Sequence, residues 1–273
     1  MTSHDVVDGV RRRLGTTKVG HGGTLDPNAT GVLVIGVGRA TRFLEYSQKA
    51  PKRYVARARF GVTTTTQDAS GEPVDRRPAT FDRAELERAT TTFVGEIDQV
   101  PPMVSAVKVG GERLYKKARR GEVVVRAPRR VSVYELEVID FRDGEEPEAT
   151  LAVRCSAGTY VRTLVHDLGA ALGTGGHVTE LRRTEAGGFA DGEALVPADV
   201  SSDRLLPLVA AVRGLPQVAV DEAEAGQVAN GRPLAGDHGV GDGELAAIVN
   251  SGELLAVYRR QGPGLVADRV VPR

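Results

Sequence analysis

The sequence has little of several features that whole classes of protein need. It contains one cysteine, Cys155, which excludes a disulfide framework and a cysteine-rich metal site. It has no tryptophan and only 4% aromatic residues, so its core must be built mainly from aliphatic side chains. No stretch approaches the roughly eighteen apolar residues of a membrane-spanning helix, and residues 1–15 lack the apolar segment of a signal peptide. These absences point to a globular protein of the cytoplasm that does not enter a membrane.

Net charge is also absent, with 36 basic and 36 acidic side chains, but the charges are unevenly distributed along the chain. Residues 1–60 carry 11 basic side chains against 4 acidic ones, and residues 108–130 carry 9 against 2. Residues 185–257 have the opposite balance, with 3 basic side chains against 12 acidic ones. The two basic segments suggest a local surface for a polyanion such as nucleic acid, although unequal solvated faces explain the pattern nearly as well.

The glycine-rich segment GHGGTLDPNATGVLVIG, residues 20–36, does not fit the common glycine motifs. No β-α-β pattern surrounds it, as dinucleotide binding requires, and no G-K-[ST] follows it, as a phosphate-binding loop requires. The five histidines lack the spacing of zinc ligands, and no G-x-S-x-G elbow supports a serine hydrolase. The segment does hold one carboxylate, Asp26, which is either part of an ordinary Asp-Pro turn or a nucleophile.

The periodicity of the chain predicts a mixture of helices and strands. Thr2 and Asp5 form a capping box at the start of one helix, and Asp82 is the N-cap of another. Strict alternation over 52–60 predicts a strand with one apolar and one basic face. The irregular order of these elements favours an α+β fold over a doubly wound sheet. Helices are expected over 2–15, 81–95 and 157–172, and strands over 52–60, 131–141 and 149–155.

A change of composition near residues 205–217 predicts a domain boundary. The segment 221–230 beyond it predicts a helix, and short apolar runs predict strands around 246–250, 254–260 and 266–271. We therefore expect a larger domain over 1–205 and a small, β-rich domain over 216–273.

Five ordered motifs between Thr2 and about residue 190 resemble those of the TruB family of tRNA pseudouridine synthases. The resemblance implies a mixed, largely antiparallel sheet flanked by helices in a catalytic domain, 1–205. It also implies an RNA-gripping insertion at about 99–130 and a PUA-like fold for the C-terminal domain. The motifs are GHGGTLDPNATGVLVIGVGRATRF, KRYVA, PPMVSAVKVGGERLYKKARRGE, CSAGTYVRTLVHDLG and HVTELRRT.

The resemblance also implies the catalytic residues. Asp26 would be the nucleophile, Arg162 its partner in an ion pair that is ideally two-pronged, and Tyr54 the ring that stacks under the target base. Tyr160 would line the same cleft as Tyr54. These roles suit the chemistry, because the base must be flipped out of its stack and a carboxylate can form a covalent intermediate. The glycines beside Asp26 would let the RNA approach closely, and no cofactor and no metal is needed.

The resemblance implies a further set of RNA-binding residues outside the catalytic group. His21 would assist extrusion of the base, Arg42 would lie near a phosphate, and Leu181 would pack against the base. The cations of the insertion would hold phosphates, which makes binding depend on salt. They are Lys108, Arg113, Lys116, Lys117, Arg119 and Arg120.

The implied substrate is the T-arm stem-loop of tRNA, with uridine-55 as the target. The protein itself is expected to be a monomer that needs no obligatory protein partner. Three alternatives remain open: a guide-RNA-dependent, dyskerin-like synthase, a non-catalytic RNA chaperone or binding module, and an aspartate-based phosphotransferase. The last would need an acidic magnesium-binding cluster, which is not evident.

Whether Asp26 attacks the sugar or the base is also left open. Relatives begin with a short strand and a D-K-P-x-G turn, so about ten residues are expected upstream of Met1.

Overall fold

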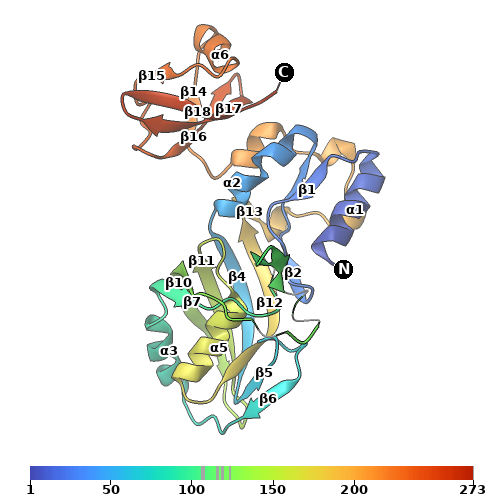
Figure 1. The fold of residues 1–273 in the computed structure, drawn as a ribbon, viewed down its shortest axis with the longest axis vertical. Helices are drawn as coiled ribbons and strands as arrows, with labels where there is room; N and C mark the ends of the chain where they lie inside the picture. The colour runs from blue at the N-terminus through green and yellow to red at the C-terminus, as the bar shows by residue number, and fades with distance from the viewer. Residues whose placement is uncertain (106–107, 115–116, 118–119, 123, 273) are drawn as a thin grey trace. The chain divides into compact units, whose positions relative to one another are not determined.

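The computed structural model contains two compact units (Figure 1). The first, here called the sheet unit, comprises Asp26–Val32 and Pro51–Glu185. The second, here called the terminal unit, comprises Met1–Leu25, Leu33–Ala50 and Ala186–Arg273. The structure describes residues 1–105, 108–114, 117, 120–122 and 124–272. Whether 1–205 and 216–273 are separate domains stays a prediction.

The sheet unit is built on a mixed sheet. Its strands and helices are β2 (Ala29–Gly31), β4 (Lys52–Phe60), β7 (Gly95–Gln99), β10 (Arg129–Arg142), β11 (Glu148–Cys155), β12 (Gly176–Ala186), α3 (Arg83–Thr91) and α5 (Val161–Ala171). Strand order is β12-β4-β11-β10-β7, and β2 lies parallel to β12. The pairs β4–β11, β11–β10 and β10–β7 are antiparallel, so the predicted mixed, largely antiparallel sheet is confirmed.

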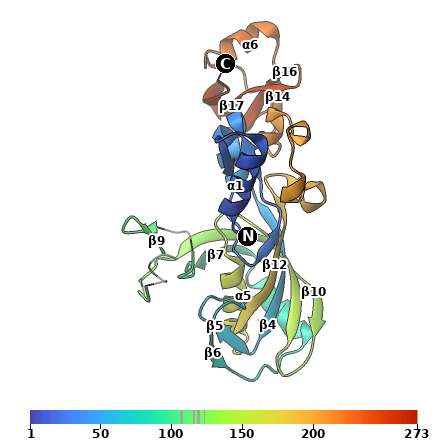
Figure 2. The ribbon, with the colours of Figure 1, turned by 90° about the vertical axis from the view of Figure 1, so that its right-hand side faces the viewer.

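Two short hairpins extend the sheet unit. One pairs β5 (Val62–Thr64) with β6 (Pro73–Arg76). The other pairs β8 (Lys108–Val109) with β9 (Glu112–Arg113), within the predicted insertion. Figure 2 shows the second hairpin standing away from the sheet, near the label β9.

The main core lies between the sheet and its two helices, as the alternation in β4 predicts. Ala56, Ala58 and Phe60 are fully buried on the inner face of β4, in one cluster with Leu164 and Leu168 from α5. Burying side chains the size of leucine or phenylalanine stabilises the fold by about 1.5–3 kcal/mol each. The same helix carries Arg162 in its first turn, so this packing fixes a residue of the predicted site.

The outer face of β4 is basic, as predicted, but its charges are already neutralised within the protein. Arg53 pairs with Glu135 at 2.6 Å, and Arg57 pairs with Glu180 at 2.9 Å. Arg59 pairs with Glu148 at 2.7 Å. These three arginines are paired with carboxylates of other strands, and whether the basic segment 1–60 contributes to a surface for a polyanion stays a prediction.

The first part of the terminal unit contains helix α1 (Ser3–Leu14). It begins at the predicted capping box, in which Thr2 and Asp5 exchange hydrogen bonds, and it ends at Gly15 in the left-handed conformation. Short elements follow in this unit: β1 (Val19–His21), β3 (Ile35–Val37), the 3-10 helix η1 (Gly38–Phe43) and α2 (Leu44–Lys49).

The second part of the terminal unit contains a five-stranded sheet in the order β14-β16-β17-β18-β15. Tyr258, Ile248 and Leu265 are fully buried in its own apolar cluster, so this sheet has a core of its own. None of the helices in the described ranges is long and apolar enough to cross a membrane. The elements are β14 (Gln217–Ala219), α6 (Glu222–Val228), β15 (Leu234–Ala235), β16 (Leu245–Asn250), β17 (Glu253–Gln261) and β18 (Gly264–Val270).

Candidate functional site

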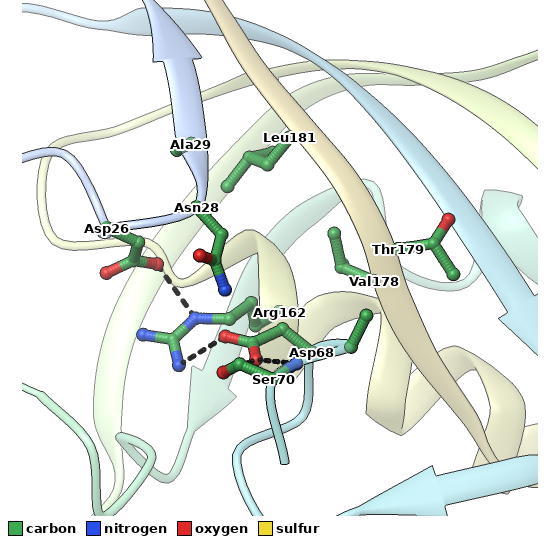
Figure 3. Close-up of a pocket in the computed structure, with 10 residues that line it drawn as sticks. Asp26, Asn28, Ala29, Asp68, Ser70, Arg162, Val178, Thr179 and Leu181 are labelled. Atoms are coloured by element: carbon green, nitrogen blue, oxygen red, sulfur yellow. Dashed lines mark hydrogen bonds and ion pairs between the residues drawn. The ribbon is translucent and has the colours of Figure 1, made fainter. Parts of the chain in front are cut away.

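A small cavity in the sheet unit brings distant parts of the sequence together (Figure 3). Its volume is about 190 Å³, below the roughly 300–1,000 Å³ of pockets that hold drug-sized ligands, so it suits a single ring better than a whole nucleotide. The lining residues are Asp26, Asn28, Ala29, Asp68, Ala69, Ser70, Arg162, Val178, Thr179 and Leu181. Three residues of the predicted site, Asp26, Arg162 and Leu181, therefore share one cavity.

The position of Asp26 depends on the close approach of β2 to β12. The register pairs Ala29 with Leu181 and Gly31 with Arg183. Gly31 has φ +95°, and a Cβ atom there would lie 2.1 Å from the carbonyl oxygen of Arg183, so only glycine fits. We expected the glycines of this segment to admit RNA. At Gly31 that expectation is wrong, because the backbone that approaches is the protein's own.

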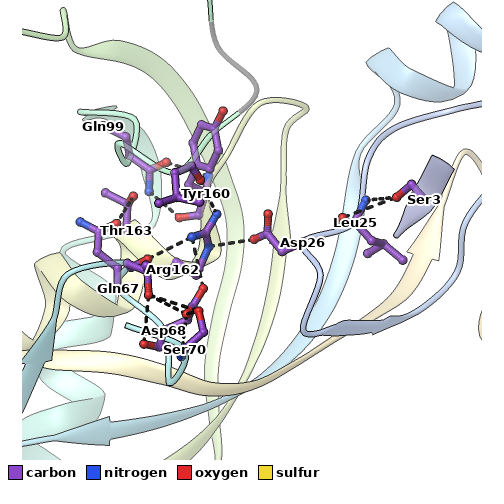
Figure 4. Close-up of polar contacts among 12 residues, drawn as sticks. Ser3, Leu25, Asp26, Gln67, Asp68, Ser70, Gln99, Tyr160, Arg162 and Thr163 are labelled. Carbon is purple, nitrogen blue, oxygen red and sulfur yellow. Dashed lines mark hydrogen bonds and ion pairs between the residues drawn. The ribbon is translucent and has the colours of Figure 1, made fainter. Parts of the chain in front are cut away.

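Arg162 and Asp26 form the predicted ion pair, with Nε 2.8 Å from Oδ2. Arg162 is buried, with 4% of its side chain exposed, whereas 36% of the Asp26 side chain is exposed. We expected a two-pronged contact, but only Nε of the guanidinium pairs with Asp26. Nη1 instead donates to the Thr66 carbonyl at 3.0 Å and to Asp68 Oδ2 at 3.2 Å, and Nη2 donates to the Val104 carbonyl at 3.1 Å (Figure 4). One guanidinium thus links the proposed nucleophile to two further segments.

Asp68 is a charged residue of the cavity lining that sequence reasoning missed. Its Oδ1 accepts hydrogen bonds from the Thr66 hydroxyl and from both the hydroxyl and the backbone N–H of Ser70. Its Oδ2 faces Arg162. The spacing T-x-D-x-S is typical of a turn in which an aspartate accepts bonds from its neighbours, and that was the available signal. Nothing in the segment indicates a partner in α5.

The two carboxylates beside Arg162 have pKa values shifted in opposite directions. Burial raises the pKa of Asp26 above its ordinary value, and the charge of Arg162 opposes this rise without cancelling it. Burial would also raise the pKa of Asp68, but the hydrogen bonds from Ser70 and Thr66 and the charge of Arg162 outweigh it and lower that pKa. Asp68 is thus the firmly ionised partner of Arg162, and Asp26 is the more basic carboxylate.

Tyr54 and Tyr160 do not line the cavity, although we expected them to share its cleft with Asp26. Tyr54 lies on β4 opposite Val153 and packs against the main core. Burial raises the pKa of both phenols, and the charge of Asp26 raises each further. Both side chains therefore lie within electrostatic reach of Asp26, and their roles toward a base stay predictions.

His21 and Arg42 belong to the terminal unit. The ring of His21 accepts a hydrogen bond from the N–H of Gly23 at 3.4 Å and meets His4 edge-on. Arg42 is exposed in η1. Their proposed contacts with RNA stay predictions.

The cations of the insertion are described only in part. Lys116 and Arg119 lie outside the described residues, as do the side chains of Lys108 and Arg113. Lys117 is half-buried. Arg120 pairs with Glu112 at 2.8 Å and with Glu122 at 2.7 Å. The contacts of these cations with phosphates stay predictions.

Family models match most of the chain. Residues 11–161 match the N-terminal domain of the TruB family of pseudouridylate synthases. Residues 162–205 match the C-terminal domain of tRNA pseudouridylate synthase B. The junction falls between Val161 and Arg162, at the start of α5.

Curated relatives and solved structures agree with these models. A tRNA pseudouridine synthase B from Symbiobacterium thermophilum is 50% identical over 85% of this chain and 78% of its own. One from Mycobacterium sp. (strain KMS) is 46% identical over 100% of this chain and 93% of its own. A crystal structure of a Cbf5-Nop10-Gar1 complex matches 100% of this chain and 82% of that chain, with 29% identity and a TM-score of 0.77. The chain belongs to the TruB family of pseudouridylate synthases.

Proposed function

We propose that this protein converts uridine-55 in the T-arm loop of tRNA to pseudouridine, with Asp26 as the nucleophile. Family membership makes the protein a pseudouridine synthase, and the curated relatives are named for tRNA. The observation that carries the rest is the ion pair between Asp26 and Arg162, at the wall of a cavity sized for one ring. The pair provides a carboxylate that is both oriented and partly exposed.

The reaction breaks the bond between C1′ and N1 of uridine and forms a bond between C1′ and C5. In the same reaction C5 loses a proton and N1 gains one. Atoms and electrons balance without an oxidant, a reductant or a cofactor. The base must leave its stack to enter the cavity, which costs a few kcal/mol. Ionised Asp26 would then form a covalent intermediate, on the sugar or on the ring, while the base turns. Leu181, on the cavity wall, would offer an apolar contact to that base.

Arg162 supports this chemistry in two ways. Its charge lowers the pKa of Asp26 relative to burial alone, so more of the carboxylate is ionised near neutral pH. Its three hydrogen bonds to Thr66, Asp68 and Val104 hold the guanidinium in place, so Arg162 can keep its position when Asp26 moves.

Degrees of identity favour direct action on tRNA over the guide-RNA-dependent alternative. Relatives named tRNA pseudouridine synthase B are 46–50% identical to this chain. The structures whose titles name Cbf5 complexes are 27–29% identical. We accordingly propose a monomer that acts without an obligatory protein partner.

The decisive experiment incubates a T-arm transcript with the purified protein alone and maps pseudouridine at each uridine. We expect one modified position, matching uridine-55. Asp26→Asn should form no product and keep RNA affinity, because the amide has the same shape but is a poor nucleophile. Product only after addition of a guide RNA would support the dyskerin-like alternative. RNA binding with no product from the unaltered protein would support a chaperone, and Asp26→Asn turnover near that of the unaltered protein would exclude the nucleophile.

A further inference from the structure

Gln99, at the end of β7, is almost completely buried, with 1% of its surface exposed. Its carboxamide makes two hydrogen bonds to the backbone of one residue, Tyr160. The Tyr160 N–H donates to Oε1 at 3.0 Å, and Nε2 donates to the Tyr160 carbonyl at 3.3 Å (Figure 4). A side chain thus pairs with the main chain as a neighbouring strand would. Burying a primary amide is unfavourable unless it is paired, and here the oxygen and one N–H of the carboxamide are used.

Tyr160 needs such an anchor because of its place in the chain. It is the N-cap residue of α5, where a serine, threonine, aspartate or asparagine would usually supply a capping side chain, and its own side chain makes no capping bond. The connection from Cys155 to Tyr160 includes Gly158, at φ +88°. No capping side chain of its own holds the N-cap residue of α5, whereas the carboxamide of Gln99 pairs with that residue's backbone.

The same start of α5 carries Arg162 two residues later. We propose that Gln99 is a positioning residue: by clamping the backbone of Tyr160, it sets the direction of the first turn of α5 and so the meeting of Arg162 with Asp26. This inference rests on the proposed function, because it concerns the geometry of the same reaction.

The beginning of the predicted insertion contacts the start of α5 through two of its residues, Gln99 and Val104. Gln99 is its first residue, and Val104 accepts a hydrogen bond from Nη2 of Arg162 at 3.1 Å. The beginning of the insertion therefore holds α5 at two successive points, Tyr160 and Arg162. Glutamine suits the first of these contacts because asparagine is one methylene shorter and glutamate would set a second oxygen against the Tyr160 carbonyl.

The test compares Gln99→Met and Gln99→Glu with the unaltered full-length protein in single-turnover assays on a T-arm transcript. Methionine keeps the volume and removes both hydrogen bonds, whereas glutamate keeps only the acceptor. We expect Gln99→Met to lower the rate constant about 100-fold, the loss typical of a misplacement near 1 Å, with RNA affinity unchanged. The rate constant of Gln99→Glu should lie between those of Gln99→Met and the unaltered protein.

The pH profile separates positioning from loss of stability. Besides Arg162, the charged groups that act on Asp26 are Asp68 and Arg183, and Gln99 contacts neither of them in the described structure. A displaced Arg162 opposes the pKa rise of Asp26 less, so the acid limb of the rate profile should move to higher pH. The matched control is Thr90→Val, which removes a buried hydrogen bond to the Glu87 carbonyl in α3, outside the cavity lining.

Thr90→Val should keep both the rate constant and the acid limb. The inference is overturned if Gln99→Met keeps the wild-type rate, or if the rate of either Gln99 variant falls without any movement of the acid limb. Should Gln99→Met not fold, the acid limb of Gln99→Glu alone decides the matter. An unaltered protein that forms no pseudouridine would instead refute the proposed function, so the two failures are distinguishable.

Discussion

Replacing Arg162 by lysine keeps the positive charge and removes the geometry on which the site depends. The guanidinium contacts Asp26, Asp68 and the carbonyls of Thr66 and Val104, at distances of 2.8 to 3.2 Å. These acceptors lie around a flat fork, whereas an ammonium group offers its donors from one point on a longer stem. At least two of the contacts must be lost in Arg162→Lys.

The magnitude follows from the burial of the site. A hydrogen bond to a charged group contributes about 1.5–3 kcal/mol, so two lost contacts correspond to about 3–6 kcal/mol. If that loss falls on the positioning of Asp26, the single-turnover rate constant should drop by about two to four orders of magnitude. Burial raises the pKa of Asp26, and the proposed nucleophile is its ionised form, so we expect activity to fall as pH drops through that pKa. A weaker contact with the cation should therefore move this loss to higher pH.

The assay measures single-turnover rate constants on a T-arm transcript from acid to neutral pH for both proteins. Arg57→Lys is the matched control, because Arg57 pairs with Glu180 on the exposed face of β4 at 2.9 Å. Exposed pairs of this kind contribute about 0–1 kcal/mol, so this control should behave as the unaltered protein. An Arg162→Lys variant with unchanged rate and acid limb would refute the reasoning.

Three further predictions concern other parts of the sheet unit. Tyr54→Ala should weaken RNA binding by about 1–3 kcal/mol through lost base stacking, whereas Tyr54→Phe restores it; equal RNA affinity in titrations of all three proteins would make Tyr54 a core residue only. Neutralising Lys116 and Lys117 together should flatten the slope of log K against log salt by about 0.7–0.9 per lost phosphate contact. Arg120→Gln, at a cation already paired, should leave that slope unchanged, and a slope equally insensitive to all three substitutions would place the RNA contact elsewhere. Lys52 is buried, which lowers its pKa to about 8 from 10.5. As pH rises, the folded state therefore loses this proton before the unfolded state does, and the free energy of unfolding should rise between pH 8 and 10.5. The rise should reach about 3 kcal/mol and disappear in Lys52→Met when both proteins are unfolded with denaturant, and identical pH dependence of the two would exclude a buried cation at this position.

Local signals in the sequence were sufficient for the elements with strong capping or alternation. Asp82 and Glu85 form the capping box of α3, and the alternation over 52–60 gave both the extent of β4 and its buried face. Strand β12 was not predicted. Its sequence does not alternate between apolar and polar residues, because the charged residue Arg183 stands at a buried position, with 2% of its surface exposed.

The site shows the same division between local and distant information. The resemblance led to Asp26, Arg162 and Leu181, which the structure places around one cavity. It did not lead to Asp68 or Gln99, because each acts through a partner more than sixty positions away, Arg162 for one and Tyr160 for the other. A threonine- and serine-rich turn and a polar strand end carry no local sign of such partners. Only the folded backbone brings them into contact.

The single contact between Arg162 and Asp26 suits a nucleophile better than the two-pronged contact that the sequence suggested. Oδ2 of Asp26 lies 2.8 Å from Nε of Arg162, and 36% of the Asp26 side chain remains exposed. A two-pronged pair would occupy both oxygens, and about two charged hydrogen bonds would then have to break before either oxygen could form a covalent bond. Arg162 is instead held by Asp68 and two backbone carbonyls, so its position does not depend on Asp26. The proposed nucleophile can therefore leave its partner during attack and return to the same orientation after the product departs.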